Sequence, residues 1–304
     1  MNLVLEQLLN GIQFGVTLFL LAAGLTLIFG VMGVINLAHG SLYMIGAYAT
    51  ALVMERAGSL LLAVPAGLLA AATAGLLIEY FVIRRLYARD HIHQVLATFG
   101  LILFVNEGAT ILFGRQPLQI AMPAALSGSW EIIPGIPYPI YRLVIIVAGL
   151  LVGMALYVLV NKTRIGMLVR AGSTHREMVR ALGVNIRLLY TVVFGLGALL
   201  AGFAGLMTAP LLAVQVGMGE QILILTFVVV VIGGVGSVRG AFFGALVVGI
   251  TDTLLRAFLP GLLRQVMTVS EADALGGGLS SVGIYMVMAV VLLIKPQGLF
   301  RAQG

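Results

Sequence analysis

The sequence predicts an all-α protein, a polytopic bundle of transmembrane helices in one domain that covers residues 1–304. Hydrophobic residues make up 61% of the chain and charged residues only 9%, whereas a soluble domain has about 25% charged residues. The apolar residues also form a series of stretches of about 20 residues, the length at which a helix crosses the hydrocarbon core of a bilayer. A soluble fold of this size could not bury so much apolar surface.

Eight spans are predicted, in a range from seven to nine. The stretch 221–258 is interrupted by GGVGSVRG, so it forms either two spans or one span with a re-entrant piece. The N-terminus has no basic region and no small-residue cleavage site, so the first span is expected to be retained. The predicted spans are residues 9–30, 41–56, 60–82, 94–114, 141–161, 188–210, 221–258 and 279–295.

Basic residues predict the orientation, because cytoplasmic loops of membrane proteins are enriched in Lys and Arg. Nine of them lie in the segments 84–89 and 162–187, which the span count places on one side of the bilayer. That side is expected to be the cytoplasm. The N-terminus and the proline-rich loop 115–140 then lie outside, and the C-terminus lies inside. The same bias explains the net charge of +6 without a nucleic-acid partner.

Several classes of enzyme are excluded by what the sequence lacks. It has no cysteine, so it has no thiol nucleophile, and it has no GxxxxGK[ST] loop for ATP. The segment IGGVGSVRG resembles a dinucleotide fingerprint, but it lies between apolar spans and lacks an acid about 20 residues later. The histidines and acids form neither a catalytic triad nor a metal-binding set. We therefore expect a non-catalytic chain with no bound metal or cofactor.

One short segment, RAGSTHREMVRALGV at 170–184, is unusually charged. Thr174 and Glu177 have the spacing of a capping box, and Gly183 is placed to end the helix in a left-handed conformation. So short a helix is marginal alone in water. It is either an ordinary loop helix or a docking helix that presents apolar and charged side chains to a cytoplasmic partner. The residues assigned to it are Thr174, Arg176, Glu177, Met178, Arg180, Ala181, Leu182 and Gly183.

Ionisable residues within predicted spans indicate function, because burying them in lipid is costly. Glu79 lies near Arg84 at the end of its span, which favours a structural ion pair. Asp252 has a possible partner at Arg256, one helical turn later, so a structural pair and a pathway role are equally supported. Glu107 has no cation nearby in sequence, which favours a pathway or interhelical role.

Small residues at four-residue spacing predict close helix packing. Gly11 and Gly15 are one such pair, and Gly236, Gly240 and Gly244 form a triplet. The spacing leaves open whether the contacts form within the chain or with a partner subunit.

Four blocks of sequence together resemble the permease subunits of branched-chain amino-acid ABC transporters of the LivH type. The first is GLTLIFGVMGVINLAHGSLYMIGAY near the N-terminus, and the second is the central TRIGMLVRAGSTHREMVRALGVNIRLLYTVVFGLGALLAGFAG. The others are VIGGVGSVRGAFFGALVVG and the terminal KPQGLF. The blocks extend over almost the whole chain.

The resemblance implies a bacterial or archaeal inner-membrane importer with several partners. These are a second permease of the LivM type, two ATPases of the LivG and LivF type that bind ATP and Mg²⁺, and an extracytoplasmic binding protein that delivers the substrate. The helix at 174–183 would then be the coupling helix that inserts into the ATPase. The polar residues expected along the substrate path are Asn36, His39, Asn106, Glu107 and Asp252.

Two other functions remain open at this stage. Permeases for urea and short amides share much of the same pattern, so the pattern leaves the substrate open between these and branched-chain amino acids. An ion-coupled secondary transporter could use Glu107 or Asp252 as its carrier, but such proteins usually contain internal repeats with broken helices, and none is evident here.

Overall fold

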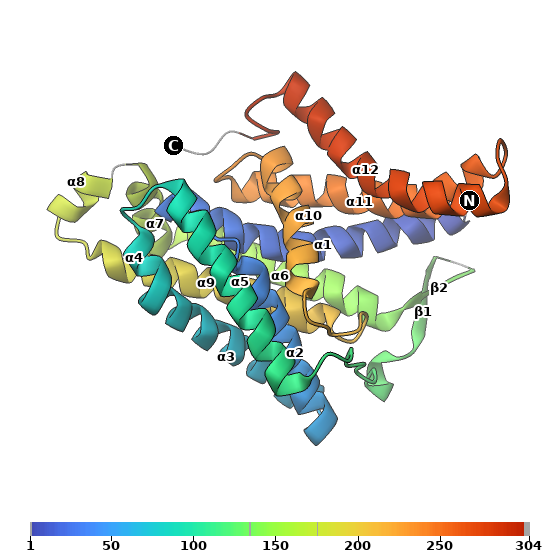
Figure 1. Ribbon diagram of the computed structural model, residues 1–304, viewed down its shortest axis with the longest axis horizontal. Helices are drawn as coiled ribbons and strands as arrows, with labels where there is room; N and C mark the ends of the chain where they lie inside the picture. Colours follow the sequence, from blue (N-terminus) through green and yellow to red (C-terminus); the bar gives the residue numbers. More distant parts are fainter. Residues whose placement is uncertain (1, 134, 175, 301–304) are drawn as a thin grey trace.

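The computed structural model describes residues 2–133, 135–174 and 176–300, and the fold is almost entirely helical (Figure 1). Two strands, β1 (Ser129–Ile133) and β2 (Ile136–Pro139), form an antiparallel hairpin in the predicted outer loop. The main helices are α1 (Asn2–Met32), α2 (His39–Ala57), α3 (Leu60–Ile78), α5 (His91–Phe113), α6 (Ile140–Lys162), α9 (Ile186–Thr208), α10 (Met218–Gly233), α11 (Val238–Leu263) and α12 (Val269–Ile294). The shorter helices are α4 (Arg84–Leu86), α7 (Arg164–Thr174) and α8 (Arg176–Ala181).

Seven helices in the described residues are long and apolar enough to cross a membrane, which confirms the predicted class of fold. One of them combines α3, a π-helical turn and α4 into a single helix, Leu60–Leu86. The other two main helices, α2 and α10, do not meet that criterion. The stretch 221–258 proves to be two helices, because the glycine-rich segment 234–237 separates α10 from α11.

The last span begins ten residues earlier than predicted. The segment after Thr268 is polar and glycine-rich, so its hydropathy gives no sign of a span. Thr268 and Glu271 nevertheless form a capping box, in which each side chain bonds the backbone of the other. This box satisfies the free N–H groups of the first turn, and the helix therefore begins at Val269.

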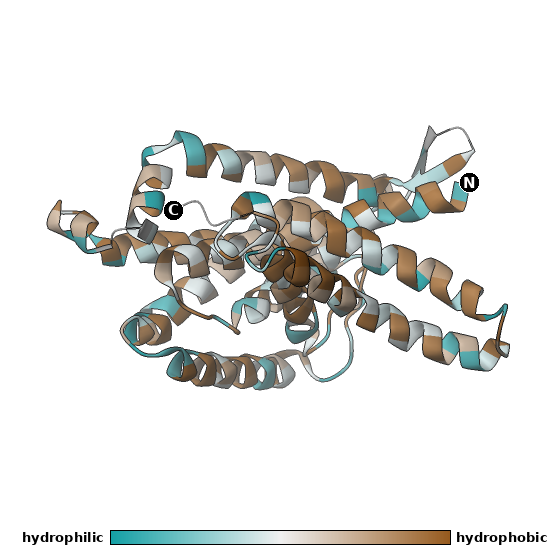
Figure 2. Ribbon diagram, turned by 90° about the horizontal axis from the view of Figure 1, so that it is seen from above, coloured by the Kyte–Doolittle hydropathy of each residue, from teal (hydrophilic) through white to brown (hydrophobic). Residues whose placement is uncertain are grey.

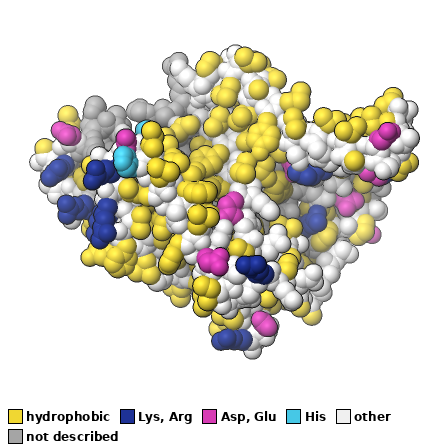
Figure 3. Space-filling model, in the orientation of Figure 1, with side chains coloured by type: hydrophobic (Ala, Val, Ile, Leu, Met, Phe, Trp, Pro, Cys, Tyr) yellow, Lys and Arg dark blue, Asp and Glu magenta, His cyan; other side chains and the backbone are white. Residues whose placement is uncertain are grey.

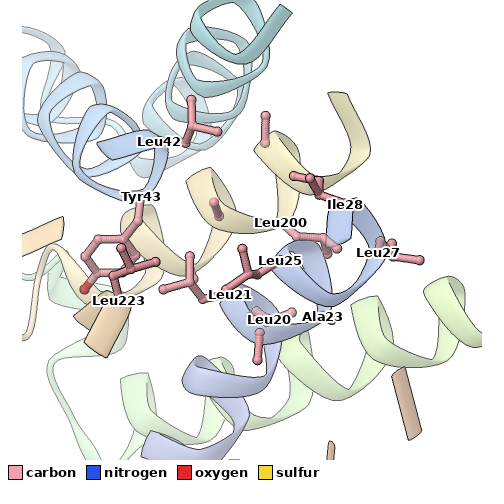
Figure 4. Close-up of a cluster of buried hydrophobic side chains, with 14 of the residues drawn as sticks. Leu20, Leu21, Ala23, Leu25, Leu27, Ile28, Leu42, Tyr43, Leu200 and Leu223 are labelled. Atoms are coloured by element: carbon pink, nitrogen blue, oxygen red, sulfur yellow. The ribbon is translucent and has the colours of Figure 1, made fainter. Parts of the chain in front are cut away.

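The centre of the bundle consists of α1 and α9. Of the residues in an apolar 18-residue stretch of each helix, 83% are buried in α1 and 61% in α9. In α12 only 11% are buried. A helix that is hydrophobic all round is buried on all sides. Figure 4 shows leucines of α1 packed between Leu42 and Tyr43 of α2, Leu200 of α9 and Leu223 of α10.

The two ends of the bundle differ in what they present. Figure 1 shows α4, α7 and α8 at one end, and the β-hairpin and the N-terminus at the other. Figure 2 shows hydrophobic residues along most of the helices and hydrophilic ones mainly toward the ends and in the loops. We refer below to the α8 end and the hairpin end.

The glycine pairs pack within the chain, which answers a question that the sequence left open. Gly11 and Gly15 of α1 face Gly249 of α11. A Cβ added to Gly249 would lie 2.5 Å from the Gly15 nitrogen and 2.6 Å from the Gly11 carbonyl oxygen. Gly233 of α10 and Gly240 of α11 meet in the same way, because a Cβ on Gly240 would lie 2.0 Å from the Gly233 oxygen. These small residues allow the backbones to touch.

Replacing Gly249 by valine is therefore expected to separate α1 from α11. Overpacking a core typically costs about 1–3 kcal/mol, and here the clash is with backbone atoms that cannot rotate away. We expect a clear loss of monodisperse protein in detergent and a lower melting temperature. The control is Gly277→Val on α12, where no atom lies within 4 Å of the added Cβ. Equal stability of the two variants would contradict the assigned contact.

Candidate functional site

A cavity with both polar and apolar lining lies between α1, α2, α6, α9, α10, α11 and α12. It has two adjoining lobes of about 490 Å³ and about 550 Å³. The lobes share a wall made by Phe14, Tyr43, Leu212, Ile222 and Arg256. Most of this lining comes from the hairpin-end halves of the helices, so the cavity belongs to that end of the bundle.

Three charged side chains line the cavity. The Arg256 Nε atom donates to Asp252 Oδ1 at 2.8 Å, which confirms the pairing that the sequence suggested. Arg142, at the start of α6, donates a hydrogen bond to Asn10 of α1. The lining residues thus supply two cations and one anion beside apolar walls. This set can bind a small molecule with a carboxylate, an ammonium group and an apolar side chain.

The floor of the cavity is closed toward the α8 end. Tyr43 and Thr208 form a 2.6 Å hydrogen bond between their hydroxyl groups. Just beyond it the first turns of α2 and α10 meet. A Cβ added to Gly40 would lie 2.2 Å from the Gly219 carbonyl oxygen, so the two backbones leave no room for a side chain. A molecule in the cavity therefore cannot pass between α2 and α10 unless these two helices separate.

Asn36 and His39 lie in and beside this closed segment and are fully buried. The chain between α1 and α2 is irregular at 33–36 and places His39 beside the middle of α1, where His39 Nε2 lies 3.2 Å from the Leu21 carbonyl oxygen. In the described part of the protein, both amide atoms of Asn36 and the Nδ1 atom of His39 have no hydrogen-bond partner. Leaving such groups unpaired costs about 1–3 kcal/mol each, so hydration of this segment on opening would be favourable. Their role in the path stays a prediction.

Asn106 and Glu107 lie on α5, and neither is among the residues that line the cavity. The Asn106 amide donates to Glu220 Oε1 of α10 at 2.5 Å. Glu107 is exposed on the outer surface, on the same helix as the exposed Phe104 and Ile111. The structure thus brings Asp252 into the cavity and leaves Glu107 outside it.

The predicted docking helix corresponds to α8 at the far end of the molecule. Val179 is buried, while Met178 is 62% exposed and Leu182 is 78% exposed. Ala181 and the charged Glu177 and Arg180 are exposed as well. One apolar side chain thus holds the helix on the bundle, and others face outward. This arrangement supplies the apolar surface expected of a helix that docks on another protein.

The end of α8 has the geometry that the sequence predicts. Gly183 has φ of 85°, and the Val184 N–H donates to the Val179 oxygen while the Gly183 N–H donates to the Arg180 oxygen. These two bonds form a Schellman motif.

The predicted start of the helix at Thr174 stays untested, because residue 175 lies outside the described residues; Thr174 on one side belongs to α7 and Arg176 on the other to α8. The side chains of Thr174 and Arg176 lie outside the described part, so the capping box stays untested.

Sequence reasoning missed α7 and several of the polar cavity residues. α7 is amphipathic and packs against α1, α6 and α9 through residues such as Val169, which is 4% exposed. The basic residues of α7 interrupt its apolar stretch, so the helical spacing of its apolar residues was not recognised in the sequence. Tyr43 was missed because its partner Thr208 lies 165 residues away. Glu220 comes just before an apolar run. An acidic residue at that position is typical of the first turn of a helix, and this was the signal in the sequence that could have identified it.

Comparison with known proteins gives a consistent result. Residues 7–294 match the model of a family described as the branched-chain amino acid transport system permease component. A high-affinity branched-chain amino acid transport system permease protein of Pseudomonas aeruginosa, BraD, is 28% identical, with 97% of this chain and 95% of that protein covered. LivH of Escherichia coli is 27% identical, with 97% and 94% covered.

A second type of permease is also similar. LivM of Escherichia coli is 29% identical, with 92% of this chain and 67% of that protein covered. No solved structure matches the chain. Because the family model covers nearly the whole length, including the cavity, the closed segment and α8, the chain belongs to the family of branched-chain amino acid transport system permease components.

Proposed function

We propose that this chain is one of two permease subunits of an ATP-driven importer that moves branched-chain amino acids across the inner membrane. The observation that carries the proposal is the difference between the two ends of the bundle. A cavity with three charged residues opens at the hairpin end, and α8 at the other end exposes Met178 together with Leu182, which directly follows the helix. A binding protein would deliver substrate to the first, and ATPase subunits would bind the second.

The cavity chemistry supports an amino acid over urea. The carboxylate of Asp252 can bind an ammonium group, and Arg256 or Arg142 can bind a carboxylate through charge-assisted hydrogen bonds. Phe14, Leu212 and other apolar residues of the wall can contact a branched aliphatic side chain. Urea carries no charge and no apolar group, so it would leave most of these groups unused.

The path to the other side runs through the closed segment in this proposal. Closure of the ATPases would move α8, and through α7 and α9 the movement would reach the contact between α2 and α10. Asn36 and His39 would then line the opened path. The N-terminus would lie outside and the C-terminus in the cytoplasm. The chain itself would bind neither ATP nor Mg²⁺ and would catalyse no reaction, since both tasks belong to the ATPases.

Uptake by the assembled transporter tests the substrate. Proteoliposomes containing both permeases and the ATPases, supplied with a binding protein, should take up radiolabelled leucine in an ATP-dependent manner. Excess valine or isoleucine should compete, whereas excess urea or acetamide should not. Uptake of urea without uptake of leucine would move the chain to the amide permeases. Leucine uptake driven by a proton gradient without ATP would support a secondary transporter.

The exposed face of α5 is our candidate for the contact with the second permease. Glu107 lies well inside α5, and a carboxylate facing lipid at the centre of a bilayer costs about 2.5–3.5 kcal/mol. A second subunit that covers this face would remove that cost. Because the chain has no cysteine, Glu107→Cys gives a single reactive thiol. We expect it to cross-link to single cysteines in the second permease.

The control for this cross-linking is Leu151→Cys on α6, where the side chain is 66% exposed. It should react with a small thiol reagent but should not cross-link to the other permease. Cross-linking from Leu151 and none from Glu107 would place the interface on α6 instead. Replacing Glu107 by glutamine is expected to reduce transport while the subunits remain assembled.

A further inference from the structure

A basic groove at the α8 end has no role in the proposed transport path. It has a volume of about 600 Å³ and lies between α4, α8 and α9. Four arginines line it, Arg84, Arg85, Arg180 and Arg187, together with Tyr87 and Tyr190. No Asp or Glu is among its lining residues. Figure 3 shows basic side chains gathered at this end of the molecule.

Within the described ranges, three of these arginines have no carboxylate partner. Arg84 is occupied, because its Nε and Nη2 atoms donate to the buried Glu79 at 3.1 and 3.0 Å. In the residues that the structure describes, Arg85, Arg180 and Arg187 form no ion pair. These three come from different segments and face one concave surface, so their positive charge is concentrated there.

Two further groups bear on the potential of the groove, besides the Glu79 carboxylate that is paired with Arg84. Asn185 caps the start of α9 by accepting a hydrogen bond from the Leu188 N–H, and the N-terminus of this 23-residue helix carries a partial positive charge. Asp90 follows α4 in the chain but does not line the groove. Its hydrogen bond with His93 lowers the pKa of that carboxyl, so Asp90 stays anionic and is bonded to His93 rather than to an arginine of the groove.

The groove lies at the level where two spans end. The helix Leu60–Leu86 ends at its edge, and α9 begins there. Both helices carry exposed apolar side chains next to the groove. Among them are Phe81, which is 54% exposed, and Leu188, which is 62% exposed. The groove therefore combines a cationic recess with an adjoining apolar surface, which suits a phospholipid rather than a free ion. Tyr87 and Tyr190 also fit this level, because tyrosine is favoured at membrane interfaces.

We propose that this groove binds the phosphate headgroup of an anionic phospholipid from the cytoplasmic leaflet. The phosphate would accept hydrogen bonds from Arg85 and Arg187, and the acyl chains would lie along α3 and α9. Arg180 belongs to α8, so the same lipid would hold the docking helix against α4 and α9. The inference rests on the proposed function only in its orientation, which places the α8 end in the cytoplasm.

The test compares lipid selectivity in the complete transporter. We would reconstitute it in phosphatidylcholine membranes with trace spin-labelled phosphatidylglycerol or spin-labelled phosphatidylcholine and measure the motionally restricted fraction of each. The wild type should prefer phosphatidylglycerol. A polybasic site gains about 1 kcal/mol per charge from anionic lipid, so R85Q and R187Q should each lower that preference roughly fivefold.

The matched control is R89Q, which removes a basic residue from the same loop but does not line the groove. It should keep the wild-type preference. Three results would overturn the proposal. One is no preference in the wild type, and another is a preference that R85Q and R187Q leave unchanged. The third is displacement of the labelled lipid by millimolar inorganic phosphate, which would assign the groove to a free anion.

A further readout separates this inference from the proposed function. The amount of ATPase that co-purifies with each variant is measured in the same samples. Loss of the ATPases from R85Q and R187Q with unchanged lipid preference would identify an acidic surface of the ATPase as the occupant and would overturn the lipid site. Loss of the lipid preference with the ATPases still bound would support it.

Discussion

Replacing both Met178 and Leu182 by aspartate is expected to release the ATPase subunits from the permease. Met178 lies on α8 and Leu182 directly follows it, and both are large apolar side chains exposed at this end. Burying each in a partner would contribute about 1.5–3 kcal/mol, so losing both should weaken the complex by roughly 100-fold or more. Co-purification of the ATPases with a tagged permease measures the effect, and transport should be lost with it.

The control for this variant is Val266→Asp. Val266 is 80% exposed, but it lies in the turn between α11 and α12, far from α8 in sequence. It should change neither the yield of the permease nor its association with the ATPases. Normal co-purification of the Met178 and Leu182 double variant would show that α8 does not dock the ATPases.

Replacing Asp252 by asparagine is expected to have the second large effect. In our account its carboxylate binds the ammonium group of the substrate, and it also holds Arg256 through the 2.8 Å ion pair. A hydrogen bond to a charged group contributes about 1.5–3 kcal/mol, so the initial rate of leucine uptake at low substrate should fall roughly 10- to 100-fold. The ATPases should remain bound, because α8 lies at the other end of the bundle.

A second Arg–Asp pair provides the matched control. Arg264 and Asp273 form a 2.7 Å salt bridge between α11 and α12, with both side chains about half exposed, and neither lines the cavity. An exposed pair of this kind contributes about 0–1 kcal/mol. Asp273→Asn should therefore leave uptake nearly unchanged. Equal losses in the two variants, or normal uptake with Asp252→Asn, would remove Asp252 from the path.

The sequence predicted the spans well because hydropathy depends on the local run of residues. It also predicted the pairs Glu79–Arg84 and Asp252–Arg256, since their partners are five and four residues apart. The left-handed Gly183 followed from the rule for helix ends. Each of these features depends on neighbours that are close in the chain.

The features that the sequence did not predict depend on distant segments or on polar helices. The hydrogen bond between Tyr43 and Thr208 joins residues far apart in the chain, as does the bond between Asn106 and Glu220. The early start of α12 depends on a capping box rather than on hydropathy. The placement of Glu107 outside the cavity depends on which face of α5 packs against α2, which hydropathy alone cannot predict when the whole helix is apolar.

The proposed path therefore combines residues of two kinds. Asp252 lines the cavity, so in our account a substrate in the cavity contacts it directly. Asn36 and His39 lie beyond the closed contact between α2 and α10, so they can meet substrate only when that contact opens. A conformation that is open at the hairpin end and closed between α2 and α10 fits both observations, because an importer must seal one side while the other is open.

The central claim, that this chain works with separate ATPases, is tested most directly by purifying the tagged chain from native membranes in mild detergent and assaying ATP hydrolysis. We predict that a second permease and two ATPase subunits co-purify, with vanadate-sensitive hydrolysis that a substrate-loaded binding protein stimulates. A chain that purifies alone and without such activity would contradict the account, and Asp252 and Glu107 would then be tested as carriers of a coupling ion.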